Sequence, residues 1–291
     1  MLCITGGGGR VSQLPHIPEE IRMQFQDKVV FITGAASGMG LATAQAFADQ
    51  GAVVYGADIS ADNLARDFAA LRGAHAVPLD IADSAAVREA FATVEREHGR
   101  LDVLVNAAGV NAPNKAALDA LNAENYKGFE AMKEGRQHNP EFYETITDED
   151  FDRVLKINLY GPFYTMRSAV PLLKKAGGGA IINFSSAAAL MSVAMPAYYP
   201  ASKAGVLGLT REAATELAPF NIRVNSLAPG AVDTPLFRQS DEEFSDFLIS
   251  MQPIKRPATP EEIAKTVLFL AGAEGSYYTG QTFSPSGGLV M

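Results

Sequence analysis

The sequence contains one cysteine, Cys3, and no run of ~18 apolar residues. A single cysteine excludes an intrachain disulfide and is compatible with a reducing compartment. Without a long apolar run, no membrane-spanning helix is expected. The first residues also lack the charged segment and apolar core of a secretory signal, so we expect a cytoplasmic protein.

Basic residues and metal-ligand patterns are scarce as well. The chain has 24 lysines and arginines against 33 acidic residues, a net charge of -9, which argues against a nucleic-acid partner. Four histidines, at positions 16, 75, 98 and 138, show no paired spacing with each other or with Cys3, so no metal site is expected. With 47% hydrophobic and 20% charged residues, the chain has the composition of a globular protein with a sizeable core.

Short apolar runs alternate with helical patterns from Lys28 to the end of the chain. The apolar runs are 29–32, 52–57, 74–79, 101–105, 180–184, 222–226 and 281–283, and the helical patterns include 41–50, 62–72, 84–98, 148–174, 201–218 and 260–271. This order predicts one α/β domain over residues 28–291, a doubly wound parallel sheet of about seven strands with helices on both faces. Residues 1–27 are interpreted as a flexible arm, which could instead reach a neighbouring subunit.

The segment 112–145 interrupts this rhythm. It is polar and charged, and Leu118, Leu121, Tyr126, Phe129 and Met132 are spaced loosely as in a short helix. A connection of this length inside a compact domain is usually functional or mobile. Because it follows a strand on the side where open α/β sheets bind ligands, we expect it to form a wall of the substrate site or a subunit contact.

A glycine-rich loop, residues 33–40, follows the first predicted strand and precedes a helix. Glycines let backbone N–H groups approach a pyrophosphate, and the helix N-terminus presents positive potential to it. In this context the G-x-x-x-G-x-G spacing favours phosphate binding over a plain tight turn. The candidate contacts are Gly34, Ser37, Gly38, Met39 and Gly40.

Asp58 ends the second predicted strand. A carboxylate at this point can accept hydrogen bonds from both ribose hydroxyls of an adenosine, and it repels a 2′-phosphate. No lysine or arginine lies in the glycine loop or directly beside Asp58. The cofactor is therefore expected to be NAD rather than NADP, although Asp58 could also serve as a helix N-cap or a surface turn residue.

Three residues form a candidate acid–base group. Tyr199 and Lys203 are four residues apart, which places them on one face of a helix, and Ser186 lies thirteen residues before the tyrosine. A nearby cation favours the phenolate and lowers the tyrosine pKa, while a serine hydroxyl can hold a substrate oxygen. The alternatives are a half-buried helix tyrosine and a solvated lysine. Ser185 is a less well spaced candidate, and Tyr198 has no lysine four residues on.

Taken together, these motifs resemble those of the short-chain dehydrogenase/reductase family, in its short single-domain branch with a Rossmann-type fold. The resemblance covers nearly all of 28–291. Thr33–Gly40 is similar to the family's T-G-x-x-x-G-x-G, and Asn106-Ala107-Ala108-Gly109 to its N-N-A-G, with alanine at the second position. Further matches are Asp80 and Ile81 at the adenine, Asn158 in a helix, and Pro229, Gly230, Val232 and Thr234 beside the nicotinamide.

The resemblance implies roles for these residues. Tyr199 exchanges a proton with the substrate oxygen, Ser186 orients that oxygen, and Lys203 lowers the tyrosine pKa and binds the nicotinamide ribose. Asn158 fixes a water that links Lys203 to solvent, although it could simply cap or kink its helix. In addition to the glycine loop and Asp58, the implied cofactor contacts are Asp80, Ile81, Asn106, Ala107, Gly109, Tyr199, Lys203, Pro229, Gly230, Val232 and Thr234.

Substrate and assembly are less constrained. In the family, the loop after Thr234 folds over the substrate, and here it carries Leu236, Phe237, Phe244, Phe247, Leu248 and Met251. These residues suggest a hydrophobic, cyclic or aromatic secondary alcohol, unless they pack on the protein itself. The expected function is an NAD-dependent alcohol dehydrogenase; the alternatives are a 3-oxoacyl thioester reductase and a silent dinucleotide-binding protein. The family also implies a homotetramer, or a homodimer, built through helices 148–174 and 199–218.

Overall fold

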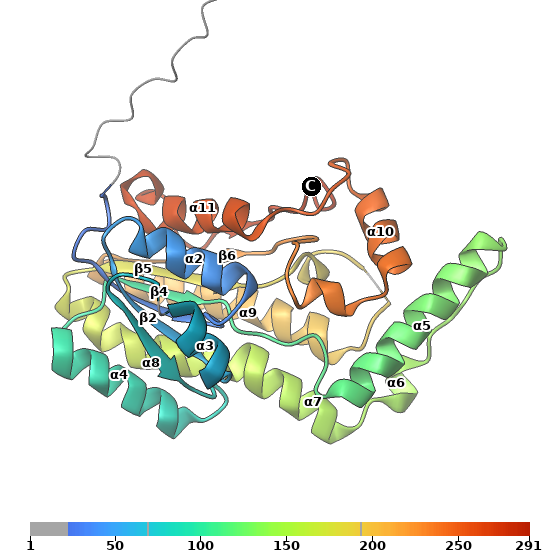
Figure 1. Cartoon of the computed structure of the whole chain (residues 1–291), viewed down its shortest axis with the longest axis horizontal. Helices are drawn as coiled ribbons and strands as arrows, with labels where there is room; N and C mark the ends of the chain where they lie inside the picture. Colours follow the sequence, from blue (N-terminus) through green and yellow to red (C-terminus); the bar gives the residue numbers. More distant parts are fainter. Residues whose placement is uncertain (1–22, 69, 193) are drawn as a thin grey trace, which may run out of the picture.

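The computed structural model describes residues 23–68, 70–192 and 194–291, and in them one parallel sheet forms the centre (Figure 1). Its seven strands have the order β3-β2-β1-β4-β5-β6-β7, and each pairing is parallel. The bounds are β1 Val29–Thr33, β2 Val53–Asp58, β3 Ala74–Pro78, β4 Val103–Asn106, β5 Gly179–Phe184, β6 Ile222–Leu227 and β7 Thr282–Phe283. The predicted doubly wound sheet is confirmed.

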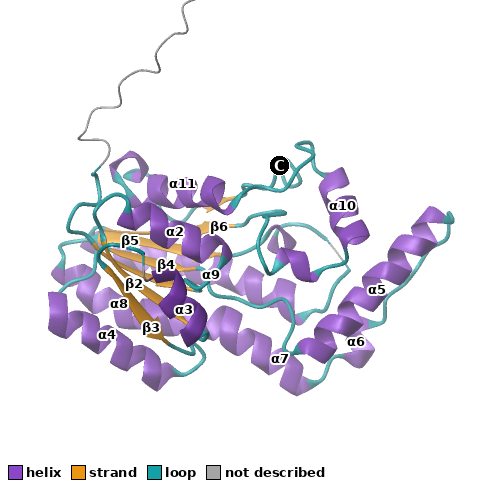
Figure 2. Cartoon of the chain, viewed as in Figure 1, coloured by secondary structure: helices purple, strands orange, loops and turns teal. Residues whose placement is uncertain are grey.

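Helices cover both faces of this sheet (Figure 2). They are α2 Gly38–Ala48, α3 Ala61–Phe68, α4 Ser84–His98, α5 Lys115–Lys133, α6 Phe142–Thr145, α7 Asp148–Leu155, α8 Gly161–Lys175, α9 Tyr198–Leu217, α10 Glu242–Met251 and α11 Pro260–Ala271. Apolar residues of α2, α3 and α11 pack on one face, and those of α4, α8 and α9 on the other.

The strand β1 shows why the central strands are apolar at successive positions. Val30 and Ile32 point into the cluster of α2 and α11, whereas Val29 and Phe31 point into the cluster of α4 and α8. All four are at most 2% exposed. Alternate side chains leave opposite faces of a strand, so a strand covered on both faces needs apolar residues throughout.

The start of the packed body differs from the predicted boundary at Lys28. Residues 1–22 of the predicted arm lie outside the described part of the chain. Phe25, inside the predicted arm, is 3% exposed, and its ring packs edge-on against Phe47 with centroids 4.7 Å apart. The core therefore includes residues upstream of β1.

The helix predicted over 148–174 is divided into three segments. Between α7 and α8 lies a π-helical turn, Lys156–Tyr160, with Asn158 buried at its centre. A π turn inserts an extra residue into the helix and is frequent at functional sites. The periodicity of apolar residues cannot reveal it, because α7 and α8 still bury their own faces.

A buried polar network joins the ends of the central strands to the helices behind them. The amide of Asn106 donates to Asn183 Oδ1 at 2.9 Å and accepts from Thr165 Oγ1 at 2.6 Å, and Asn183 donates to Thr210 Oγ1 at 3.0 Å. Each of the four residues is at most 2% exposed. Buried polar groups that are fully paired fix one relative position of their elements, here β4, β5, α8 and α9.

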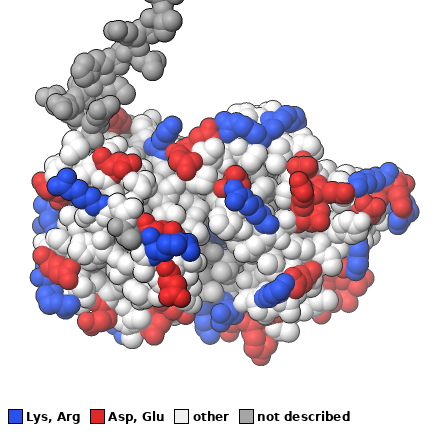
Figure 3. Space-filling view, viewed as in Figure 1, with Lys and Arg blue, Asp and Glu red and all other residues white. Residues whose placement is uncertain are grey.

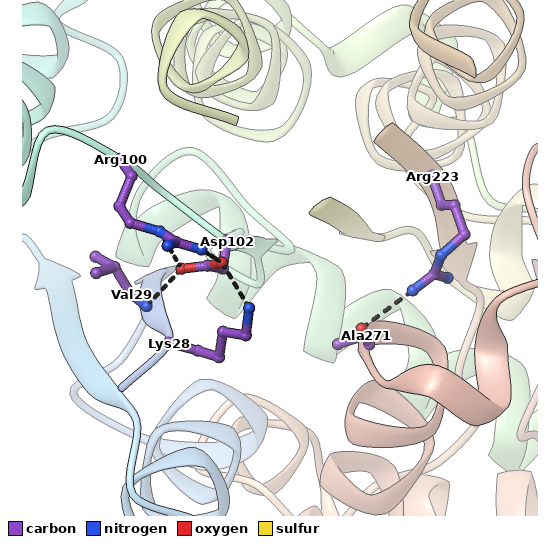
Figure 4. Close-up of polar contacts among 6 residues, drawn as sticks. All are labelled: Lys28, Val29, Arg100, Asp102, Arg223 and Ala271. Atoms are coloured by element: carbon purple, nitrogen blue, oxygen red, sulfur yellow. Dashed lines mark hydrogen bonds and ion pairs between the residues drawn. The ribbon is translucent and has the colours of Figure 1, made fainter. Parts of the chain in front are cut away.

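Two charged side chains near the amino-terminal ends of the strands, those of Asp102 and Arg223, form hydrogen bonds with neighbouring elements (Figure 4). The Asp102 carboxylate accepts from Val29 N at 3.0 Å, from Lys28 Nζ at 3.1 Å and from the Arg100 guanidinium. The Arg223 guanidinium donates to the carbonyl groups of Leu270, Ala271 and Gly272 at the C-terminus of α11, that of Ala271 at 3.0 Å, and to the carbonyl of Gly275 in the turn that follows. A helix C-terminus leaves carbonyl groups unpaired and carries partial negative charge, so a partly buried arginine is stable there.

The segment 112–145 folds mainly as the helix α5, which is longer than its loose apolar spacing predicted. The Asn114 side chain caps α5 by accepting from Ala117 N at 2.9 Å. In Figure 1, α5 projects away from the sheet, and α10 lies on the same side of the molecule.

The molecular surface carries mixed charge. On the face drawn in Figure 3, acidic and basic side chains are interspersed, with no continuous basic stripe. No helix in the described part of the chain is long and apolar enough to cross a bilayer. In the same residues, no group of three or more histidine, cysteine or acidic side chains is placed to hold a metal ion.

Candidate active site

The glycine loop between β1 and α2 has a shape that only glycines allow. Gly34 and Gly38 have φ angles of 70° and 51°, in the left-handed region. A Cβ on Gly34 would lie 2.8 Å from Ala108 Cα, and one on Gly40 would lie 2.1 Å from the Gly34 carbonyl oxygen. The loop is therefore pressed against the segment after β4, and Ser37 begins α2 without a side-chain cap. The first turn of α2 keeps unpaired backbone N–H groups, which suit a phosphate group.

Asp58 lies at the end of β2, beside this loop. One carboxylate oxygen accepts from Ala36 N at 3.1 Å, and the other accepts from Ser60 N at 3.0 Å. Each oxygen retains a lone pair that could accept from a ribose hydroxyl. The turn role and the ribose role expected from the sequence are thus compatible, and the two backbone bonds fix the carboxylate in place.

The adenine side of the predicted cofactor site is formed by residues after β3. The Asp80 carboxylate accepts a hydrogen bond from Ala82 N, two residues further along the chain, at 2.9 Å. Ile81 is 6% exposed and packs against Gly161, where a Cβ would come within 2.6 Å of the Ile81 side chain. Ile81 thus connects the adenine side to the N-terminus of α8.

The segment after β4 is braced by side chains rather than by an asparagine pair. The side chain of Asn106 is engaged in the buried network, so its role is to hold the strand end. Where the family pattern has a second asparagine, this chain has Ala107, and the Thr33 hydroxyl accepts from Ala108 N at 3.2 Å. Thr33, the first residue of the glycine motif, therefore has a bracing role that the sequence did not predict.

The four predicted catalytic residues come together around residues 109 and 110. Tyr199 and Lys203 occupy the first two turns of α9, and Lys203 Nζ lies 6.0 Å from the centroid of the Tyr199 ring. Ser186 follows β5 and reaches the Tyr199 phenol through its hydroxyl. Lys203 is 5% exposed, and its ammonium donates to the Phe184 carbonyl at 3.1 Å.

Burial dominates the acid–base properties of this group. It raises the pKa of Tyr199, and the hydrogen bond with Ser186 opposes that shift. Burial also lowers the pKa of Lys203 to about 8. Both shifts disfavour the charged form, as desolvation does. The predicted lowering of the Tyr199 pKa by Lys203 is therefore not seen in the protein alone, where the ammonium is directed at a backbone carbonyl.

Asn158, on the π-helical turn, forms two hydrogen bonds with the backbone of Val110. Its Oδ1 accepts from Val110 N at 2.9 Å, and its Nδ2 donates to the Val110 carbonyl at 2.8 Å and to Ser202 Oγ at 3.2 Å. Asn158 thus fixes the loop that faces Lys203. The predicted role in holding a water molecule remains a prediction.

Gly109 lies between the lysine and the asparagine. A Cβ at this position would stand 3.0 Å from Lys203 Nζ and 3.2 Å from Asn158 Oδ1. Any other residue would separate the two side chains or displace the loop. The geometry therefore gives Gly109 a role in the approach of Lys203 and Asn158, besides the cofactor contact expected from the motif.

The structure also distinguishes Ser186 and Tyr199 from their neighbours Ser185 and Tyr198. Ser185 is 5% exposed and donates to the Lys203 carbonyl at 2.8 Å, so it positions α9 and is not available to a substrate. Tyr198 is 2% exposed and lines a cavity of about 750 Å³ between α5, α6 and the starts of α7 and α9. Burial and the negative charge of Asp150 raise the pKa of Tyr198 to about 12. Neither Ser186 nor Tyr199 lines that cavity.

The segment after β6 closes the site from the other side. The Pro229 carbonyl accepts from Ala187 N at 2.9 Å, next to the predicted catalytic serine. Gly230 packs so closely on Ser286 that a Cβ would lie 2.9 Å from the Ser286 Cα. Val232 and Thr234 are buried, and the Thr234 methyl group lies 3.0 Å from where a Cβ on Gly38 would be. The nicotinamide-side segment and the glycine loop thus meet at the carboxyl ends of the strands.

Comparisons with known proteins agree with this arrangement. The family model described as short chain dehydrogenase matches residues 28–244. A 3-oxoacyl-[acyl-carrier-protein] reductase of Thermotoga maritima is 38% identical over 276 residues, covering 92% of this chain and 100% of the relative. A cis-4-hydroxycyclohexanecarboxylate dehydrogenase of Sinomonas cyclohexanicum is 36% identical, with 91% and 98% covered.

A third relative acts on a different kind of alcohol by its name. The galactitol 2-dehydrogenase of Agrobacterium fabrum is 34% identical over 282 residues, covering 92% of this chain and 100% of the relative. The family match spans most of the sheet and all four predicted catalytic positions. The chain belongs to the short-chain dehydrogenase family and is an oxidoreductase.

Proposed function

We propose that this protein is an NAD-dependent dehydrogenase that interconverts a secondary alcohol and its ketone. The observation that supports this most directly is the grouping of Tyr199, Ser186 and a buried Lys203 beside a loop held by Asn158. When bound at the carboxyl ends of the strands, the nicotinamide cofactor supplies hydride acceptance and donation. The chain itself binds and orients the cofactor and the substrate, and it moves the proton.

The proposed steps follow from the positions of these side chains. The Ser186 hydroxyl donates to the substrate oxygen and holds it within reach of the Tyr199 phenol. With its raised pKa, Tyr199 is protonated at neutral pH and is an acid for ketone reduction. For alcohol oxidation it acts as a base, which requires positive charge near the phenol; Lys203 and the oxidised nicotinamide ring are the expected sources.

The residues fit a dinucleotide. The glycine loop offers a cradle that added Cβ atoms would fill, and Asp58 presents a fixed carboxylate beside it. We propose that Gly34 and the first turn of α2 hold the pyrophosphate and that Asp58 binds the adenosine ribose. The negative charge of Asp58 favours NAD over NADP, since it would repel a 2′-phosphate.

The assay that tests this function follows absorbance at 340 nm with NAD and NADP and a panel of secondary, cyclic and aryl alcohols. Tyr199→Phe serves as the control, because it keeps the ring and removes the hydroxyl. Turnover with NAD that the variant abolishes is the expected result. Equal activity of the parent enzyme with both cofactors would contradict the role of Asp58, and turnover retained by Tyr199→Phe would contradict the mechanism.

A second candidate function is reduction of a 3-oxoacyl thioester. It is favoured by the 38% identity to the 3-oxoacyl-[acyl-carrier-protein] reductase of Thermotoga maritima. The acidic Asp58 and the net charge of -9 weigh against it, because that reaction usually uses NADPH and an anionic carrier. Acetoacetyl thioesters with NADPH and with NADH in the same assay would distinguish the two functions.

Location and assembly follow as further parts of the proposal. We expect a cytoplasmic homotetramer or homodimer, because aromatic residues that the sheet does not cover are exposed at the start of α8: Tyr160, just before the helix, and Phe163 are 44% and 43% exposed. Light scattering of the purified protein measures the assembly, and a monomer at micromolar concentration would contradict it.

A further inference from the structure

Helix α5 of the 112–145 segment contacts the loop and helix that follow Thr234 at three points. The Asn122 side chain donates to the Gln239 carbonyl at 2.8 Å. The Phe129 and Phe247 rings lie with centroids 6.0 Å apart. The Lys133 ammonium donates to the Glu243 carboxylate at 2.7 Å. Each contact joins residues more than 100 positions apart in the chain, so only the tertiary structure brings them together.

These contacts use one face of each helix. Asn122, Phe129 and Lys133 are seven and four residues apart, which places them along one side of α5. On α10, Glu243 and Phe247 are four residues apart and share a face in the same way. The Lys133 ammonium also lies 4.2 Å from the centroid of the Phe129 ring, so the ionic and aromatic contacts form one unit. We call these three contacts the α5–α10 clasp.

The base of α5 is held by other contacts. Asn114 caps the helix, and the Arg153 guanidinium of α7 donates to the Pro113 carbonyl at 2.9 Å. On the side of α5 away from α10, Glu124 pairs with Lys127 at 2.6 Å and with His138 of the returning segment at 2.8 Å. The helix is therefore tied to the body at its start and to its own return segment.

The element on the other side of the clasp leads directly to the predicted active site. Thr234 packs beside Gly38 of the glycine loop, and the chain runs from Thr234 through residues 237–239 into α10. Asp241 caps α10 by accepting from Glu243 N at 3.0 Å, next to the clasp. A change in the position of α10 would therefore be passed to the loop that begins at Thr234.

We propose that Asn122, Phe129 and Lys133 are positioning residues, which hold the 234–251 segment in place over the substrate through the α5–α10 clasp. This inference rests on the proposed function, because it assigns that segment to the substrate side of the site. The segment 112–145 then acts as a brace for the substrate loop, and substrate affinity depends on residues that do not touch the substrate.

Charge reversal tests the clasp, because its two charged residues can be exchanged. Lys133→Glu places a third carboxylate beside those of Glu243 and Glu130, and the repulsion should break the contacts of the clasp. Glu243→Lys places two ammonium groups opposite each other and should have the same effect. The double variant restores an ion pair in the opposite sense. The matched control is Lys115→Glu, which breaks an exposed pair with Asp119 on the same helix at its other end.

Each single variant should raise the KM for the alcohol by roughly three- to tenfold, with kcat and the KM for NAD within about twofold of the parent. Tenfold corresponds to about 1.4 kcal/mol. The double variant should return the KM to within about twofold, and Lys115→Glu should leave it unchanged. A KM unaffected by both single variants, or a double variant no better than the singles, would overturn the proposal.

Amide hydrogen exchange separates this proposal from the proposed function. Exchange in residues 237–251 should increase in each single variant and recover in the double variant, whether or not a substrate is known. Unchanged exchange would show that the clasp does not hold the segment, and increased exchange with an unchanged KM would refute the positioning role. If the parent protein turns over no alcohol, the proposed function fails, while the exchange experiment still decides whether the clasp exists.

Discussion

Replacing Gly109 by alanine should damage catalysis more than folding. The added Cβ would stand 3.0 Å from Lys203 Nζ and 3.2 Å from Asn158 Oδ1, closer than nearly all real contacts of a Cβ atom. One of the two side chains, or the loop between them, must move by a few tenths of an ångström. Overpacking of this kind costs about 1–3 kcal/mol. If that displacement falls on Lys203, kcat should drop by roughly 5- to 150-fold, since each 1.36 kcal/mol is a factor of ten.

A matched substitution on the catalytic helix provides the control. Gly208, on α9 below Lys203, has no heavy atom within 4 Å of the position of an added Cβ, so Gly208→Ala should leave kcat unchanged. It should also stabilise the helix by up to about 1 kcal/mol. The measurement is kcat for the same alcohol in both variants, with thermal unfolding as the check on folding. A Gly109→Ala enzyme with kcat within twofold of the parent would refute the reasoning about this contact.

Three other predictions concern buried polar groups. Lys203→Met should abolish turnover yet stabilise the protein near pH 7, because it removes a buried ammonium that has one hydrogen bond. The folded pKa of about 8 lies below the unfolded value, so the unfolded chain binds more protons at pH values between the two. The stability of the parent relative to the variant should therefore rise by roughly 2 kcal/mol from pH 8 to 10 in urea unfolding, and a difference that does not change with pH would contradict this. Arg223→Met leaves four carbonyls at and just after the C-terminus of α11 without their donor and should cost about 3 kcal/mol in urea unfolding. Arg66→Met, on the surface, should leave the midpoint unchanged, and equal effects of the two variants would argue against the cap. Thr165→Val removes the donor to Asn106 Oδ1 inside the buried network and should cost about 1–3 kcal/mol, so a neutral result would show that the network does not fix the strand ends.

Much of the fold could be predicted from local sequence patterns. The run of apolar residues in β1 is buried on both faces, and that requirement alone separates a central parallel strand from an edge strand. The glycines at 34 and 38 have positive φ angles, which explains why the motif has glycine there. Tyr199 and Lys203 share a helix face because their spacing is one turn.

Other features depend on contacts that no local pattern contains. At the π-helical turn, the Asn158 side chain pairs with the backbone of Val110, 48 residues earlier in the chain. The direction of the Tyr199 pKa shift was predicted incorrectly for the protein alone, because spacing gives the distance to a lysine but not the depth of burial. The packing of Phe25 against the core likewise could not be distinguished from a free arm by composition.

The sequence by itself thus determined the order of the strands and of the helices that cover the sheet, the positions that need glycine, and which residue types could move a proton, since these follow from spacing and backbone geometry. The loop expected after Thr234 instead contains the helix α10, Glu242–Met251. Only the tertiary structure decided what Lys203 touches, why Gly109 must be small, and that α5 is joined to α10 through Lys133 and Glu243. These features depend on distances and burial between segments far apart in the chain, and those are set by the packing of the whole domain.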